Sequence, residues 1–173
     1  MGAAHRRPAA AAAAIRLLVL DVDGVLTDGR LYYGARGEAL KAFHVRDGYG
    51  IKALRRAGIE IAVISGRRSP AVSARCRELG IRHVIQGVED KLQALTRLRS
   101  KLRLLPSVCA CVGDDTPDVP LMRSVGLAFA VADAHPDARA AAHHATIRSG
   151  GRGAVREVCD RLLAARRRHR SPP

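Results

Sequence analysis

Aromatic residues, cysteine motifs and long apolar runs are all scarce in this sequence of 173 residues. Phe, Trp and Tyr together make up 3% of the chain and Trp is absent, so the stacking surfaces of single-strand nucleic-acid binders are hard to build. No apolar run approaches the roughly 18–20 residues that span a bilayer. The four Cys residues include no Cys-x-x-Cys pair, which argues against zinc and against a disulfide framework. Reduced thiols in a cytoplasmic protein are the simplest interpretation.

Positive charge is abundant, but much of it lies at the two ends of the chain. The formal net charge is +14 at pH 7, and such an excess is typical of proteins that bind phosphate backbones. Half of it comes from seven arginines within residues 1–16 and 164–173, two segments without any acidic residue. We expect a disordered Ala/Arg extension at 1–14 and a basic disordered tail at 164–173. The hydrophobic fraction of 47% is typical of a folded domain.

Short apolar runs alternate with helix-like stretches between residues 15 and 163. Continuous apolar runs bounded by polar residues or glycine are typical of buried parallel strands. We expect strands at 15–22, 59–64, 82–85, 108–112 and 127–131, and helices at about 47–57, 69–79, 89–103, 115–125, 135–142 and 152–168. This alternation predicts one α/β domain, a three-layer Rossmann-like parallel sheet with helices on both faces.

Residues 29–45 break the alternation. Their pattern is typical of two short strands around a glycine-bounded turn at 34–37, which predicts a β-hairpin inserted after the first strand. Residues 15–163 contain no internal repeat and no linker, so we expect the hairpin to belong to the same domain.

Acidic residues are few, yet five of the sixteen lie in two loops that follow expected strands. Asp21 and Asp23 follow the first strand, whereas Asp114, Asp115 and Asp118 follow the strand at 108–112. The carboxyl ends of parallel strands form the ligand-binding edge of such a sheet. Carboxylates gathered there repel one another unless a cation is present, and Mg²⁺ prefers carboxylates, waters and phosphate. Asp115 and Asp118, taken singly, are explained equally well as helix-capping or turn residues.

The pair Asp21 and Asp23 at a strand end suits two-step phosphoryl transfer. Asp21 would attack phosphorus and form an aspartyl-phosphate intermediate. Asp23 would protonate the leaving oxygen and then activate the hydrolytic water. The Ser65 hydroxyl can bind phosphate oxygens together with the N–H groups that follow it, and Lys91 supplies a positive charge. The sequence therefore predicts Asp21, Asp23, Ser65 and Lys91 as catalytic residues.

Several segments resemble known phosphatases. Residues 21–29, 64–67, 89–91 and 113–118 match the four motifs of the haloacid-dehalogenase-like phosphatases. Within that superfamily, residues 41–51, 131–136 and 150–159 resemble the family of 3-deoxy-D-manno-octulosonate 8-phosphate phosphatases. The resemblance extends over about residues 15–163 without a large gap, whereas the two ends match nothing in the family core.

The resemblance implies a role for each matching residue. Asp21 would be the nucleophile and a Mg²⁺ ligand, with Asp114 as the second side-chain ligand. Asp23 would be the acid/base and would bind the metal through its backbone carbonyl, while Ser65 and Lys91 would hold the transferring phosphate. The substrate pocket of the family corresponds to Asp23, His44, Val45, Arg46, Asp47, Gly48, Lys52, Arg67, Arg75 and Lys91.

The resemblance also implies a cap-less homotetramer. In the family the hairpins form a central barrel, so that a neighbouring subunit completes each active site. A flexible glycine-rich stretch at 150–153 would let Arg152 reach toward a neighbour's site. We therefore expect a cytoplasmic, Mg²⁺-dependent hydrolase of a phosphorylated sugar acid in lipopolysaccharide sugar biosynthesis, with no nucleic-acid or membrane partner.

Two alternatives stay open at the level of sequence. The same chemistry could serve a nine-carbon 2-keto-3-deoxy sugar acid phosphate, and the pocket residues near Arg46, Lys52 and Arg67 would discriminate between the two substrates. A basic nucleic-acid-binding protein would account for the charge, but it gives no use to Asp21 and Asp114.

Overall fold

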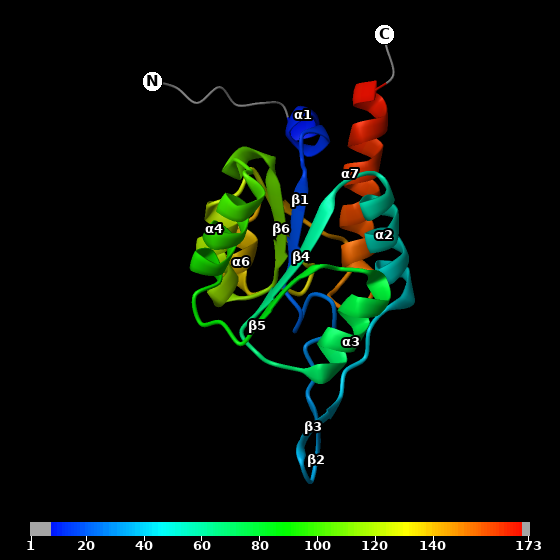
Figure 1. Cartoon of the computed structure of the whole chain (residues 1–173), viewed down its shortest axis with the longest axis vertical. Coiled ribbons are helices and arrows are strands. Elements are labelled where there is room, and N and C mark those ends of the chain that lie inside the picture. The colour runs from blue at the N-terminus through cyan, green and yellow to red at the C-terminus, as the bar shows by residue number, and fades with distance from the viewer. Residues whose placement is uncertain (1–7, 171–173) are drawn as a thin grey trace.

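A six-stranded sheet forms the centre of the protein in the computed structural model, which describes residues 8–170 (Figure 1). The strand order is β5-β4-β1-β6-β7-β8, and all neighbouring strands are parallel. Five of these strands were predicted, whereas β8 is too short to give a recognisable pattern. The strands are β1 (Leu17–Leu20), β4 (Glu60–Ser65), β5 (His83–Gln86), β6 (Cys109–Gly113), β7 (Leu127–Ala130) and β8 (His144–Ala145).

Helices cover both faces of the sheet, which confirms the predicted three-layer α/β fold (Figure 1). After β5 the chain returns to the centre of the sheet and builds the other half, so right-handed crossovers put the helices of the two halves on opposite faces. One face carries α2 (Val45–Arg56), α3 (Pro70–Leu79) and α7 (Ala154–Arg170), and the other carries α4 (Lys91–Leu102), α5 (Val119–Arg123) and α6 (Pro136–Ala141). Short helices are α1 (Pro8–Ala13), η1 (Pro106–Val108) and η2 (Thr116–Asp118).

The central strand β1 is fully buried, and its register defines the functional edge of the sheet. Its four residues Leu17–Leu20 are at most 2% exposed, and burying each such side chain stabilises the fold by roughly 1.5–3 kcal/mol. Leu20 lies level with residues near the ends of β4 and β6. Asp21, Ser65 and Asp114 therefore meet at the same carboxyl edge.

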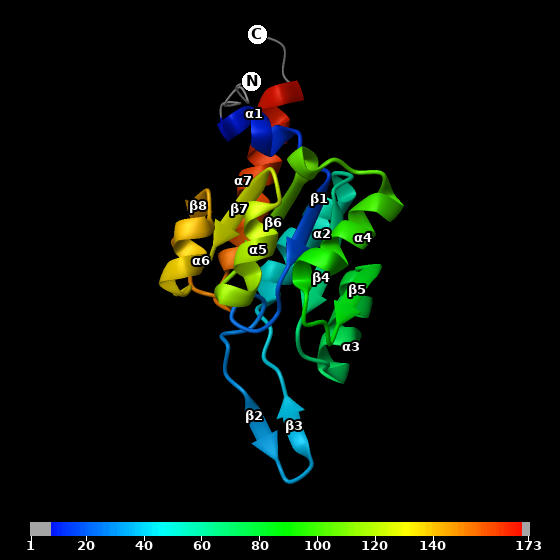
Figure 2. The ribbon, with the colours of Figure 1, turned by 90° about the vertical axis from the view of Figure 1, so that its left-hand side faces the viewer.

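The predicted hairpin is present and projects from this edge (Figure 2). Its strands β2 (Tyr32–Gly34) and β3 (Gly37–Leu40) pair antiparallel around the expected turn and form a separate two-stranded sheet. Such an isolated hairpin is only marginally stable in water. Four large apolar side chains near its strands are exposed in the single chain: Leu31, Tyr32, Tyr33 and Leu40.

Both ends of the described chain are more ordered than the sequence suggested. Within the extension that we expected to be disordered at 1–14, residues 8–13 form α1. Within the tail that we expected to be disordered at 164–173, residues 164–170 continue α7. The rest of the two predicted segments, except residue 14, lies outside the described part of the chain.

Packing between the first and last helices explains this order. Alanine is the best helix former, and the Ala-rich α1 packs against α7 with Ala12 buried. The buried positions of α7 extend to Leu162 and Ala165, so the core holds this helix almost to its basic end. Within residues 8–170 no helix is both long and apolar enough to cross a membrane.

Candidate active site

The loops after β1, β4 and β6 surround a cavity of about 630 Å³ at the carboxyl edge of the sheet. The first residue of α4, Lys91, also reaches this cavity. The structure therefore brings together side chains that lie far apart in the sequence, as the strand-end rule requires. Six predicted site residues line the cavity: Asp21, Asp23, Ser65, Arg67, Lys91 and Asp114.

The predicted nucleophile Asp21 is buried and paired with Lys91. The Nζ atom of Lys91 lies 2.9 Å from Oδ1 of Asp21 and 2.7 Å from Oδ1 of Asp118. The contact with Asp21 is an ion pair without hydrogen-bond geometry, so this buried oxygen has no hydrogen-bond partner among the described residues. A carboxylate oxygen can accept more than one partner, so this oxygen retains capacity for a cation beside Lys91.

Asp118 shapes the loop after β6 and was missing from the predicted site residues. Its Oδ2 accepts hydrogen bonds from the backbone N–H of Asp114 at 3.0 Å and of Asp115 at 3.3 Å. Its Oδ1 accepts a hydrogen bond from Lys91. The side chain lies so close to Gly113 that a Cβ there would be 2.6 Å from that of Asp118. The spacing of the acidic residues was compatible with a place for Asp118 in this site, but it was equally compatible with a helix-capping role.

Burial and mutual repulsion raise the pKa values of two carboxyls in this cluster. The pKa of Asp21 rises to about 6, because burial and the charge of Asp118 outweigh the attraction of Lys91. The pKa of Asp114 rises to about 8 through burial and the charges of Asp21 and Asp118. Burial lowers the pKa of Lys91, but the two carboxylates around it more than reverse this and raise it. The lysine therefore stays charged.

The acidic cluster fits a divalent cation. Asp21, Asp114 and Asp118 each offer a carboxylate oxygen, and these atoms all lie within 4.8 Å of one another. Carboxylate oxygens beside a phosphate-sized cavity suit Mg²⁺. The hydrogen-bond-free oxygen of Asp21 and the raised pKa of Asp114 both indicate carboxylates that a cation would stabilise.

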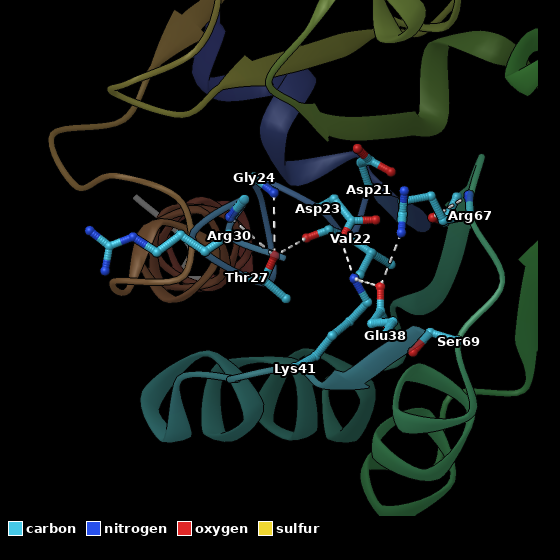
Figure 3. Close-up of polar contacts among 12 residues, drawn as sticks. Asp21, Val22, Asp23, Gly24, Thr27, Arg30, Glu38, Lys41, Arg67 and Ser69 are labelled. Atoms are coloured by element: carbon cyan, nitrogen blue, oxygen red, sulfur yellow. Dashed lines mark hydrogen bonds and ion pairs between the residues drawn. The ribbon is translucent and has the colours of Figure 1, made fainter. Parts of the chain in front are cut away.

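A second charge network joins Asp23 to the hairpin (Figure 3). Lys41 donates a hydrogen bond to Oδ1 of Asp23, and its Nζ lies 3.1 Å from Oε2 of Glu38. The same Glu38 oxygen accepts a hydrogen bond from Nη2 of Arg67 at 3.3 Å, and that nitrogen also donates to the Tyr33 hydroxyl at 3.1 Å. Neither Lys41 nor Glu38 was predicted as a site residue, because a hairpin pattern does not reveal which residue of the domain it faces.

The remaining predicted substrate residues do not line this cavity. They occupy the first two turns of α2 and the preceding position, or lie on α3: His44, Val45, Arg46, Asp47, Gly48, Lys52 and Arg75. Arg75 pairs with Glu78 at 2.8 Å and lies against Gly48, where a Cβ would be 2.3 Å from its Nη2 atom. Lys52 lines a different cavity between α2 and α3. Within one chain, the predicted substrate pocket therefore falls into two separate groups.

Asp47 is buried and caps a different helix. Its Oδ1 accepts a hydrogen bond from the backbone N–H of Arg156, in the first turn of α7, at 2.7 Å. Its Oδ2 has no hydrogen-bond partner in the described part of the chain. Burial raises the pKa of this carboxyl, although the Arg156 N–H and the charge of His44 act in the opposite direction. Asp47 therefore ties α2 to α7.

The glycine-rich segment 150–153 packs against the loop after β1. A Cβ on Gly150 would lie 1.6 Å from the carbonyl oxygen of Gly24, so only glycine allows this approach. Arg152 is exposed, and its Nη2 lies 3.9 Å from Oδ2 of Asp28. The start of the segment thus packs against the loop that carries Asp21 and Asp23 in its own chain, and the reach of Arg152 toward a neighbour stays a prediction.

Comparisons with known proteins show what the whole chain is similar to. The family model described as haloacid dehalogenase-like hydrolase matches residues 31–126. The 3-deoxy-D-manno-octulosonate 8-phosphate phosphatase KdsC of Escherichia coli K12 is 56% identical over 151 residues, which cover 87% of this chain and 80% of that protein.

Two crystal structures extend the likeness to three dimensions. The 3-deoxy-D-manno-octulosonate 8-phosphate phosphatase of Yersinia pestis has a TM-score of 0.90 at 52% identity, with 92% of this chain and 86% of that chain covered. The Moraxella catarrhalis phosphatase of the same name has a TM-score of 0.90 at 45% identity, with 92% of this chain and 91% of that chain covered. That structure is a complex with a magnesium ion, a phosphate ion and KDO, the abbreviation for 3-deoxy-D-manno-octulosonate.

Proposed function

Because the chain belongs to the 3-deoxy-D-manno-octulosonate 8-phosphate phosphatases, within the haloacid dehalogenase-like hydrolases, we propose that it hydrolyses 3-deoxy-D-manno-octulosonate 8-phosphate to 3-deoxy-D-manno-octulosonate and phosphate. The observation that supports this best is the meeting of Asp21, Asp23, Lys91 and Asp114 at one cavity. The Moraxella relative holds both products together with magnesium. We place the reaction in the cytoplasm, in the supply of a lipopolysaccharide sugar.

In the first half of the proposed reaction, an aspartyl-phosphate forms. A carboxylate oxygen of Asp21 attacks phosphorus, and the bond from phosphorus to the sugar oxygen breaks. Asp23 gives a proton to the departing sugar oxygen. Lys91, held between two carboxylates, places its charge beside the transferring phosphoryl group, and the Ser65 hydroxyl binds the same group.

In the second half, water replaces the sugar. Asp23, now a carboxylate, takes a proton from water, which attacks phosphorus and releases phosphate from Asp21. Asp21, Asp114 and the backbone carbonyl of Asp23 would hold Mg²⁺, with Asp118 beside them. When bound, the cation supplies positive charge that offsets the charges of the carboxylates and of the phosphate oxygens.

We further propose a homotetramer in which subunits share their sites. The exposed apolar side chains of the hairpin support this assembly, since they are uncovered in the single chain. The separation of the two groups of substrate residues supports shared sites, because His44, Arg46 and Lys52 of one subunit could then reach the substrate at the cavity of another. Arg152 is the remaining cross-subunit candidate.

Phosphate release from a panel of sugar phosphates, with and without Mg²⁺, tests the proposal. We expect Mg²⁺-dependent release from 3-deoxy-D-manno-octulosonate 8-phosphate and none from the Asp21→Asn variant. Asp137→Asn, which alters an exposed residue of α6, serves as the matched control. Full activity of Asp21→Asn would refute its role as nucleophile, and preference for a nine-carbon sugar acid phosphate would favour the alternative substrate.

A further inference from the structure

The proposed acid/base residue contacts a lysine that comes from the hairpin. Lys41 follows β3 directly, and its ammonium group donates a hydrogen bond to Oδ1 of Asp23 (Figure 3). Only 1% of the lysine side chain is exposed. Lysine side chains are almost never so buried unless they are paired, and this one does not line the catalytic cavity. It therefore contacts Asp23 without being part of the cavity lining.

Lys41 is itself held by Glu38, and Glu38 by Arg67. The Nζ atom of Lys41 and Nη2 of Arg67 lie 3.1 Å and 3.3 Å from the same oxygen, Oε2 of Glu38. Burial raises the pKa of Glu38, but hydrogen bonds with Ser69, Lys41 and Arg67 outweigh burial and hold the pKa below its usual value. Glu38 thus stays anionic and fixes the lysine between two carboxylates.

The contacts that Asp23 makes with other side chains in residues 8–170 involve only one of its two carboxyl oxygens. Every ion pair and hydrogen bond of this carboxyl group within residues 8–170 goes to Oδ1. The side chain is 22% exposed and lines the catalytic cavity. Oδ2 is therefore the oxygen that can exchange a proton with the reacting groups.

We propose that Lys41 is a positioning residue, which holds Oδ1 of Asp23 and thereby aims Oδ2 at the leaving-group oxygen. The inference rests on the proposed function, because it assigns the acid/base role to Asp23. Misplacing a catalytic group by about 1 Å can cost about 10²-fold in rate, so a fixed carboxyl group matters. The hairpin then serves the chemistry of its own chain as well as any assembly of subunits.

The choice of leaving group separates a positioning role from a merely structural one. The substitution Lys41→Met provides an unbranched side chain of similar length that lacks the ammonium group. The ratio kcat/KM covers only the steps up to departure of the leaving group, in which Asp23 acts as the acid. Phenyl phosphate and p-nitrophenyl phosphate are similar in shape and lack a carboxylate for Arg67, but phenoxide is the stronger base and depends more on protonation.

We expect Lys41→Met to lower kcat/KM by about 10²-fold for phenyl phosphate and by less than about threefold for p-nitrophenyl phosphate. Lys41→Arg restores a cation and should recover most of the loss. Glu38→Gln removes the charge that holds Lys41, so kcat/KM should fall more for phenyl phosphate than for p-nitrophenyl phosphate, but by less than in Lys41→Met. This variant tests the proposal independently if Lys41→Met does not fold. Lys101→Met, on an exposed lysine of α4, should match the wild type.

Equal losses on the two aryl phosphates would overturn the proposal, as would full activity of Lys41→Met. A failure of the proposed function is seen separately. In that case the wild-type enzyme would not release phosphate from 3-deoxy-D-manno-octulosonate 8-phosphate, whereas the difference between the two aryl phosphates could still be measured.

Discussion

Gly24 and Asp114 approach so closely that a Cβ atom on Gly24 would lie 2.0 Å from Oδ2 of Asp114. Gly24 also has a φ of +82°, in the left-handed region that favours glycine. The glycine after the Asp21-x-Asp23 pair therefore does more than allow a turn. It leaves room for the Asp114 carboxylate, which comes from the loop after β6, and the proposed metal site depends on that room.

Filling this space should impair the metal site. We expect Gly24→Ala to displace the Asp114 carboxylate and to lower both Mg²⁺ affinity and phosphate release by at least about tenfold. Gly58→Ala is the matched control, because Gly58 has a φ of +79° but the atom nearest to its Cβ would be 3.9 Å away. Titration calorimetry measures the affinity, and unchanged Mg²⁺ binding by Gly24→Ala would show that the loop adapts.

Asp118 should be essential for catalysis although it was not among the predicted residues. The variant Asp118→Asn can still accept a backbone hydrogen bond but leaves Lys91 with a single carboxylate partner. We expect kcat to fall by about 10²-fold, as for the loss of one preorganised charged group. Asp115→Asn, an exposed neighbour in the same loop, should retain nearly full activity. A wild-type kcat for Asp118→Asn would reduce its role to that of a loop former.

Mg²⁺ should stabilise the folded protein, because a cation at the cluster removes repulsion among buried carboxylates. At 100 times its dissociation constant, the ion should add about 2.7 kcal/mol to the free energy of unfolding, or roughly 5–10 °C in Tm. Asp114→Asn should lose most of this gain, whereas Asp115→Asn should keep it. Dye-based thermal unfolding measures the shift, and an equal gain in Asp114→Asn would place the ion elsewhere.

The pH dependence of stability should report on Asp47. Burial raises the pKa of its carboxyl in the folded protein, so the folded state holds the proton more tightly than the unfolded state does. The contribution of Asp47 to stability therefore falls as pH rises from the unfolded pKa of about 4 toward the raised folded value. The variant Asp47→Asn should gain stability relative to the wild type over that window.

Denaturant unfolding of both proteins at several pH values checks this expectation. Asp137→Asn, on exposed α6 surface, corrects for the general loss of one negative charge. A difference between Asp47→Asn and wild type that does not change with pH would contradict the expectation.

Shared sites predict recovery of activity on mixing two damaged chains. Asp21→Asn removes the proposed nucleophile, and Arg46→Ala removes a side chain that would serve a neighbour's cavity. In tetramers assembled at random from equal amounts of the two, about a quarter of the sites would combine an intact Asp21 with an intact Arg46. Phosphate release at limiting substrate measures the recovery. A mixture no more active than the average of its parts, or a monomer in sedimentation, would contradict shared sites.

Local sequence patterns were sufficient to predict the architecture and the residues at the centre of the site. Burial on both faces produces continuous apolar strands, and parallel strands place their carboxyl ends at one edge, so Asp21, Ser65 and Asp114 could be expected to meet. The hairpin after the first strand was equally visible from its glycine-bounded turn. These features depend on neighbours in the sequence or on the general rules of a parallel sheet.

Only the tertiary structure decided which side chains complete that site. The contact of Lys41 with Asp23 depends on the angle at which the hairpin leaves the sheet, and no local pattern encodes that angle. The Asp118 carboxylate belongs to the site because Lys91 and the backbone N–H groups of Asp114 and Asp115 donate hydrogen bonds to it. Their composition led us to expect disorder at both ends of the chain. Packing of α1 on α7 stabilises both helices instead, because burial between distant segments outweighs the local polarity of the sequence.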